Sequence, residues 1–170
     1  MIFRKNLSDK MKEEAVSLGL CAQWTAEWKD NSSKDEMVDK FVTGIDFCIK
    51  HNFPSTKVMK KDFGDVIHAH GVYVDENVRL TNPELVILNG CCVSNISYDM
   101  ITAGEIYVRH DCTLSLYVRE MSFVVVNVFD NARVEVHADE YSKCTVFQYG
   151  GEVIASEGVK VRDRKKFTFK

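Results

Sequence analysis

Five histidines are the first residues to consider for chemistry, and two of them are only two positions apart, in His68-Ala-His70. On an extended strand this spacing places both imidazoles on one face. Neutral imidazole binds zinc and other transition metals, so the pair is a plausible arm of a metal site. His110 or His137 would supply a third ligand only if the fold brought one of them there.

Together with Glu76, this pair resembles the first metal-binding motif of the cupins, which are antiparallel β-barrels that often hold a metal. The interval between His70 and Glu76 is longer than in that motif, and no proline follows Pro83 to form the second cupin motif. We therefore interpret the histidines as surface or turn residues and predict no metal ligand and no cofactor. A cupin-like metal enzyme using His68, His70 and His110 remains an alternative.

Patterns for nucleophilic or phosphate chemistry do not occur in the sequence. There is no Gly-x-Ser-x-Gly elbow, no Gly-x-Gly-x-x-Gly loop and no Walker motif. The six cysteines form no CxxC pair and have no regular spacing, so they predict buried, reduced thiols instead of a zinc site or a disulfide framework. We predict no catalytic residue.

The length, composition and net charge of the chain limit the classes of protein to which it can belong. A chain of 170 residues, 45% hydrophobic and 28% charged, is typical of a soluble globular protein. Its formal charge of −3 predicts no strong attraction to nucleic acid or to a membrane. A DNA-binding accessory protein stays a second alternative, through its helices or the short basic cluster Arg162-Asp-Arg-Lys-Lys166. Met1–Asn6 do not start a secretory signal, and we expect a cytoplasmic protein.

The hydrophobic spacing is helical up to about Phe63 and predicts a helical part over residues 1–63. Ser8 is expected to cap a first helix, and Trp24 and Trp28 fall on one apolar stripe that we expect in the core. Ser33, with Glu36 three residues later, forms a capping box that opens a further helix. Gly19 is expected to end the first helix, Pro54 to end the one opened by Ser33, and Ser55 to cap a last short helix.

From residue 64 to residue 170 the period becomes two, which predicts strands with one buried face. The strands also repeat: Ile106–Leu116, Val126–Val136 and Val146–Ile154 share apolar and turn positions at intervals of about 20 residues, and Leu85–Val93 precedes them. A constant interval of this length is typical of a β-solenoid with two strands per coil. An antiparallel β-sandwich or barrel is the alternative.

Equivalent residues of a solenoid lie above one another, so the repeat predicts columns of side chains. Outward ladders are expected to include Tyr107, Arg109, Arg133, Glu135 and His137. We expect the helical part to cover one end of the stack, and the charged tail from Val159 to Phe167 to protect the other. The predicted inner columns are Ile87, Val108, Val128 and Gln148; Val93, Leu114, Val134 and Ile154; and Cys91, Cys112 and Ala132.

The stretch from Leu20 to Trp28, followed by Gly44–Cys48, resembles an N-terminal helical module of uncharacterised gut-bacterial and phage-associated proteins. In those proteins the module precedes repeats similar to Val126–Val136. The resemblance implies a helical part followed by a solenoid, and it implies no catalytic residues.

These observations together predict an α+β protein with a helical cap on a β-solenoid. Long flat faces without an enclosed cleft favour binding over catalysis. We therefore expect a non-enzymatic binding or assembly module, related to phages or mobile elements by the resemblance. Its partner would be a protein or a glycan, and self-association into a homo-oligomer is left open.

Overall fold

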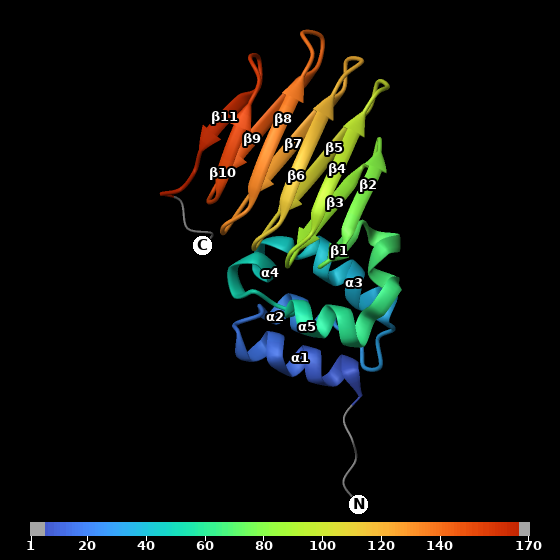
Figure 1. Cartoon of the computed structure of the whole chain (residues 1–170). Coiled ribbons are helices and arrows are strands. Elements are labelled where there is room, and N and C mark those ends of the chain that lie inside the picture. The colour runs from blue at the N-terminus through green and yellow to red at the C-terminus, as the bar shows by residue number, and fades with distance from the viewer. Residues whose placement is uncertain (1–5, 167–170) are drawn as a thin grey trace, which may run out of the picture. The chain divides into compact units, whose positions relative to one another are not determined.

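The computed structural model describes residues 6–166 and contains two compact units, a helical unit and a β-solenoid, which divide between His70 and Gly71 (Figure 1). The helical unit contains α1 (Leu7–Ser17), α2 (Ala22–Glu27), α3 (Lys34–Thr43), α4 (Ile45–His51), α5 (Thr56–Val58), the π-helical turn η1 (Met59–Phe63) and the 3₁₀ helix η2 (Gly64–His70). Helical structure therefore continues seven residues past Phe63, where the spacing of apolar residues stops being helical.

Side-chain N-caps begin three of the five α-helices of the described chain, α1, α3 and α5. Ser33 and Glu36 form the predicted capping box of α3, and the Ser55 hydroxyl caps α5 by accepting a hydrogen bond from the Val58 N–H. The prediction for Ser8 is wrong, because Asn6 is the N-cap of α1. The Ser8 hydroxyl instead accepts a buried hydrogen bond from the Trp28 indole Nε1, at 3.1 Å.

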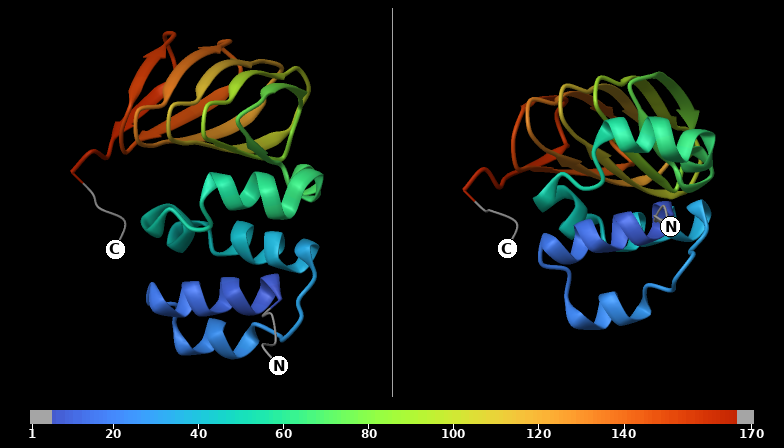
Figure 2. Two further views of the ribbon diagram at one scale, coloured as in Figure 1. Left: turned by 60° about the horizontal axis from the view of Figure 1, so that its bottom comes forward. Right: turned by 90° about the horizontal axis from the view of Figure 1, so that it is seen from below.

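The solenoid consists of parallel strands arranged in two sheets, which excludes the antiparallel sandwich or barrel. Figure 2 shows the two sheets facing each other, joined by a turn at each end of every coil. Sheet A has the order β1-β3-β5-β7-β9-β11, and sheet B has the order β10-β8-β6-β4-β2. The strands are β1 (Val72–Val74), β2 (Asn77–Thr81), β3 (Leu85–Asn89), β4 (Val93–Tyr98), β5 (Ala103–Val108), β6 (Thr113–Val118), β7 (Phe123–Val128), β8 (Arg133–Ala138), β9 (Lys143–Gln148), β10 (Glu152–Ala155) and β11 (Lys160–Asp163).

In the middle coils the register repeats every 20 residues, as predicted. Val108 pairs with Val128, which pairs with Gln148, and Leu114 pairs with Val134. These inward positions form one core in which most side chains have no exposed surface. Burying each valine or leucine there stabilises the fold by about 1.5–3 kcal/mol.

The predicted columns are wrong by one residue in the first and last copies. Leu88, not Ile87, pairs with Val108, and Ser94, not Val93, pairs with Leu114. Val153, not Ile154, pairs with Val134, because the corner at residues 149–151 is one residue shorter than the one before it. A slip of one residue turns a strand side chain to the opposite face, and Val93 and Ile154 are accordingly 58% and 70% exposed.

One corner of the solenoid is held together by side chains that accept hydrogen bonds from the backbone of a neighbouring coil. Asp75, His110 and Asp130 all have positive φ, and the corresponding position in the coil between them is Gly90. The His110 Nδ1 accepts from the Gly90 N–H at 2.9 Å, and Asp130 accepts from the His110 N–H at 2.8 Å. This ladder orients the turns and so aligns the strands that follow them.

Candidate functional site

The histidine pair that suggested a metal site does not lie on a strand. His68 and His70 lie on the 3₁₀ helix η2, so the expected placement on one strand face is wrong. Both ring nitrogens of His70 lie close to carboxylates of α3: Nε2 is 2.8 Å from Asp35 Oδ1 and Nδ1 is 2.9 Å from Asp39 Oδ1. His70 therefore connects η2 to α3, and its nitrogens are already engaged.

The other two histidines of the metal hypothesis lie in the solenoid. Burial, followed by the nearby Arg109 charge, lowers the pKa of His110, whose Nδ1 accepts the Gly90 N–H. His137 projects from β8, where Nε2 is 2.9 Å from Glu135 Oε1 and the ring stacks on Tyr117 at 5.2 Å. Across residues 6–166, no three His, Cys, Asp or Glu side chains are grouped so that they could hold a metal ion.

All six cysteines are free thiols, and four of them are buried as predicted. Cys92, not Cys91, occupies the small inner column with Cys112, and the Cys112 Sγ accepts the Cys92 N–H at 3.3 Å. A hydrogen bond between the two thiols and their burial raise the pKa of Cys112, so this thiol stays protonated. The exceptions to burial are Cys21 and Cys91, which are exposed.

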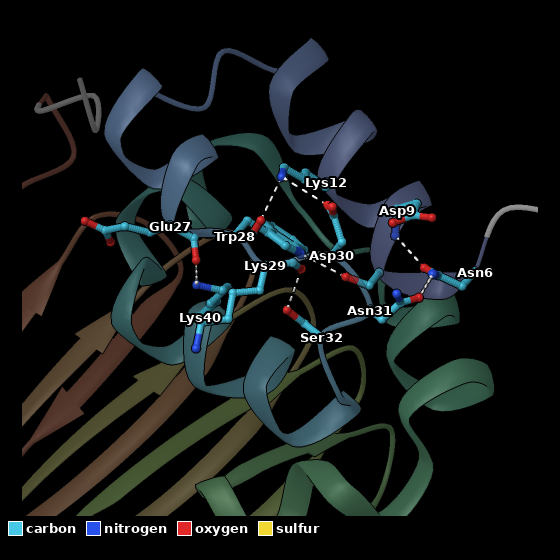
Figure 3. A network of polar contacts seen from close by, with 11 residues as sticks. Asn6, Asp9, Lys12, Glu27, Trp28, Lys29, Asp30, Asn31, Ser32 and Lys40 are labelled. Atoms are coloured by element: carbon cyan, nitrogen blue, oxygen red, sulfur yellow. Dashed lines mark hydrogen bonds and ion pairs between the residues drawn. The ribbon is translucent and has the colours of Figure 1, made fainter.

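The tryptophans divide between core and surface. Trp28 is buried as predicted, and Figure 3 shows it beside Lys12, whose Nζ is 2.7 Å from the Trp28 carbonyl oxygen and 3.8 Å from Asp30 Oδ1. Trp24 is half-buried and lines an open pocket of about 330 Å³ in the helical unit. The polar lining mixes carboxylates and ammonium groups, so it favours no single ligand charge: Glu27, Glu36, Asp39, Lys29 and Lys40.

The expected outward ladders are only partly exposed. Arg109 is buried, at 2% exposure, so its assignment to an outward ladder is wrong; its Nη1 donates to Asn89 Oδ1 at 3.2 Å. Tyr107 is half-buried and donates to Glu105 at 2.8 Å. Arg133, Glu135 and His137 are exposed on β8, as predicted. Glu135 pairs with His137, and the Arg133 Nε lies 3.5 Å from the Glu152 carboxylate of β10, so the charged groups of this face already have partners.

A different ladder stands out at the other corner of the solenoid, where sheet B leads back into sheet A. Ile101, Met121 and Tyr141 occupy equivalent turn positions of three successive coils, 20 residues apart, because the strands on either side keep that register. Their exposed fractions are 73%, 58% and 69%. We call these three residues the corner ladder. The corner ladder was not predicted from the sequence, although the 20-residue interval between its three residues was the available signal.

Acidic groups accompany the corner ladder. Glu120 and Glu140 each directly precede a ladder residue, and Asp139 lies in the same turn as Tyr141. Asp139 accepts hydrogen bonds from the N–H groups of Glu120, Tyr141 and Ser142, and interaction with Ser142 is the main reason that its pKa is lowered. The carboxylate is therefore ionised at neutral pH. The corner combines an apolar ladder with these three carboxylates and with one guanidinium, that of the exposed Arg119, which lies over the Tyr117 ring.

The turn that carries Met121 has an unusual backbone conformation. Glu120 and Met121 both have positive φ, a left-handed conformation that is uncommon for residues other than glycine. Within this turn, the Ser122 hydroxyl donates a hydrogen bond to the Arg119 carbonyl oxygen at 2.6 Å. A tight turn of this kind leaves no room for a large side chain on its inner side, so the middle of the turn faces solvent.

Comparisons with protein-family models, with curated proteins and with solved structures found no match. Within residues 6–166, no helix is both long and apolar enough to cross a membrane.

Proposed function

We propose that this protein is a non-enzymatic binding module whose solenoid presents the corner ladder to a protein partner. The observation that carries the proposal is the stacking of three large, exposed apolar side chains, Ile101, Met121 and Tyr141, in consecutive coils. Single exposed apolar residues are ordinary on protein surfaces, whereas contiguous ones mark interaction sites. Aromatic side chains and methionine are also enriched in protein interfaces.

The chemistry of the corner indicates which partner fits. In-register coils lie about 4.8 Å apart, so the ladder offers apolar contacts at a regular spacing along one line. The carboxylates of Glu120, Asp139 and Glu140 lie beside that line. A segment that presents apolar side chains next to lysine or arginine would match both features. An origin in phages or mobile elements belongs to the same proposal, and it rests on the resemblance of the helical module and the repeat.

Peptide display against the purified protein tests the proposal. Peptides recovered on the unmodified chain are tested for binding to the triple variant Ile101→Ser/Met121→Ser/Tyr141→Ser. The matched control is Val93→Ser/Arg133→Ser/Glu135→Ser, which changes three exposed residues on the outer face of sheet B. Circular dichroism shows whether each variant keeps its β structure.

We expect the recovered peptides to combine apolar residues with lysine or arginine. Their affinity should fall by about a hundredfold in the corner-ladder variant, as expected for the loss of anchoring side chains, and should persist in the control. Peptides that bind the corner-ladder variant as well as they bind the unmodified chain would contradict the proposed site. Recovery of only acidic peptides would contradict the proposed charge of the partner.

A further inference from the structure

The coil formed by β10 and β11 is the last one in the described part of the chain, and its edges are open. Every strand from β3 to β9 pairs with a neighbour on each side. Among residues 6–166, β10 pairs only with β8, and β11 pairs only with β9. One side of each terminal strand therefore presents backbone N–H and C=O groups with no strand beside them, which is a template for pairing with another chain.

The inward side chains of this coil are uncovered as well. Val161 is in register with Val146 in the core column, yet Val161 is 43% exposed while Val146 has no exposed surface. Val153 and Val159 pack against the core and remain half-buried. The core of the solenoid thus ends in a layer of valines that lacks the next layer.

The two edges carry opposite charges. Glu152 begins β10, where its carboxylate lies 3.5 Å from Arg133 Nε of β8, and Glu157 follows the strand. β11 contains Lys160 and Arg162 together with Asp163, and further basic residues follow it. Charges on an edge strand normally prevent pairing with an identical strand. Here each edge repels a copy of itself and attracts a copy of the other edge.

We propose that two copies of this protein associate end to end through the terminal coil, with β10 of each copy paired to β11 of the other. A twofold axis parallel to the strands produces this arrangement, and it produces the same contact twice, as a closed dimer requires. Because the chain reverses direction between β10 and β11, the new strand pairs are antiparallel. The surface of the terminal coil shares no residue with the corner ladder, so this inference does not depend on the proposed binding function.

One register of the β10–β11 pairs between the two copies covers the exposed inward side chains and also places opposite charges beside each other. Val153 then lies opposite Val161 of the second copy, and Ala155 lies opposite Val159 of the second copy, so the uncovered inward side chains cover one another. On the outer face of the same strand pair, Glu152 lies opposite Arg162 of the second copy. The two strands match in length, at four residues each. The alternative twofold axis, perpendicular to the strands, would instead place β10 against β10 and bring glutamates together.

Sedimentation of the full chain over a wide concentration range tests this inference. We expect the mass to rise from 19.4 kDa towards twice that value as the concentration increases. Val161→Lys places a charge in the contact and should raise the dissociation constant at least about tenfold. Val93→Lys is the matched control, because Val93 is also an exposed valine but lies away from the terminal coil. It should leave the dissociation constant unchanged.

A charge reversal tests the register, and it stays informative if Val161→Lys fails to fold. Arg162→Glu should weaken association about tenfold by facing Glu152 of the second copy, and Glu152→Arg/Arg162→Glu should restore it. Failure of the double variant to restore association would overturn the proposed pairing. A monomer at every concentration would overturn the inference as a whole.

Discussion

His70 is the polar side chain with the most specific surroundings, because each of its ring nitrogens lies within 3 Å of a different aspartate of α3. The arrangement explains why a histidine two residues from another one need not be a metal ligand: here it joins two helical segments.

Replacing His70 by alanine is expected to destabilise the helical unit by about 1–2 kcal/mol, since two contacts with aspartates of α3 are lost at a partly exposed site. Tryptophan fluorescence during urea unfolding measures the effect, because both tryptophans belong to this unit. His68→Ala, an exposed position on the same helix, is the control, with an expected change within about 0.5 kcal/mol. Stoichiometric metal that is lost in either variant would contradict the structural role of His70.

Burial also makes the solenoid sensitive to alkaline pH. Burial raises the pKa of Cys144 from its ordinary value of 9.0 to about 12, and burial raises the pKa of Tyr98 as well. Above about pH 9 the unfolded chain releases the Cys144 proton while the folded chain keeps it, so the unfolded state binds fewer protons. This contribution to stability is complete below the unfolded pKa and is lost as the pH rises towards the folded value.

We expect the free energy of unfolding to fall by about 1 kcal/mol between about pH 9 and about pH 10 through Cys144 alone. Urea unfolding followed by circular dichroism measures it. Cys144→Ala removes this thiol and should reduce the pH dependence, although it also lowers the stability at neutral pH by leaving a small cavity. An equally steep decline in the variant would assign the effect to other groups.

At the level of single elements, the fit between β4 and β5 depends on a glycine. Tyr98 at the end of β4 is fully buried, and its hydroxyl donates to the Pro83 carbonyl oxygen at 2.8 Å. A Cβ on Gly104 of β5 would lie 2.1 Å from the Tyr98 Oη and 2.6 Å from its ring. The tyrosine therefore fills the space that a side chain at position 104 would occupy in the inward column.

Gly104→Ala is expected to destabilise the solenoid by about 1–3 kcal/mol, because a buried ring with a fixed hydrogen bond must move. Urea unfolding followed by circular dichroism measures the change. In a Tyr98→Leu background the same substitution should cost less, since the ring is gone, and the difference is the coupling energy of the pair. Equal costs in both backgrounds would show that the glycine serves the backbone and not the tyrosine.

The formal net charge of the whole chain is only −3, and its lysine and arginine residues do not form a long basic run along the sequence. Phosphate contacts by lysine and arginine supply most of the affinity of a DNA-binding protein. We therefore expect no measurable binding to duplex DNA at low salt, with fluorescence anisotropy of a labelled duplex as the measurement. Tight binding that weakens steeply with salt, and that is lost in Arg164→Ala/Lys165→Ala/Lys166→Ala, would favour the DNA-binding alternative instead.

Local signals account for the parts of the fold that could be predicted. The alternation of Val124, Val126 and Val128 with other residues specifies one face of a strand, and its repetition at 20 residues specifies the coil. Ser33 caps a helix through atoms three residues away. Ser8 does not act through such a local partner. Its hydroxyl accepts a hydrogen bond from Trp28, 20 residues away, and Asn6 caps the helix instead.

The sequence by itself determined the solenoid, its coil length and the inward columns of the middle coils, because alternating apolar and polar residues permit only one face to be buried. Only the tertiary structure decided the register of the first copy. Leu85–Leu88 is an unbroken apolar run without alternation, so only the pairing of β3 with β5 determines that Leu88, and not Ile87, lies beside Val108. The partners of His70 and the exposure of Ile101, Met121 and Tyr141 were likewise decided by the fold. Residue type says which side chains prefer burial, whereas only the path of the chain determines which of them find a neighbour.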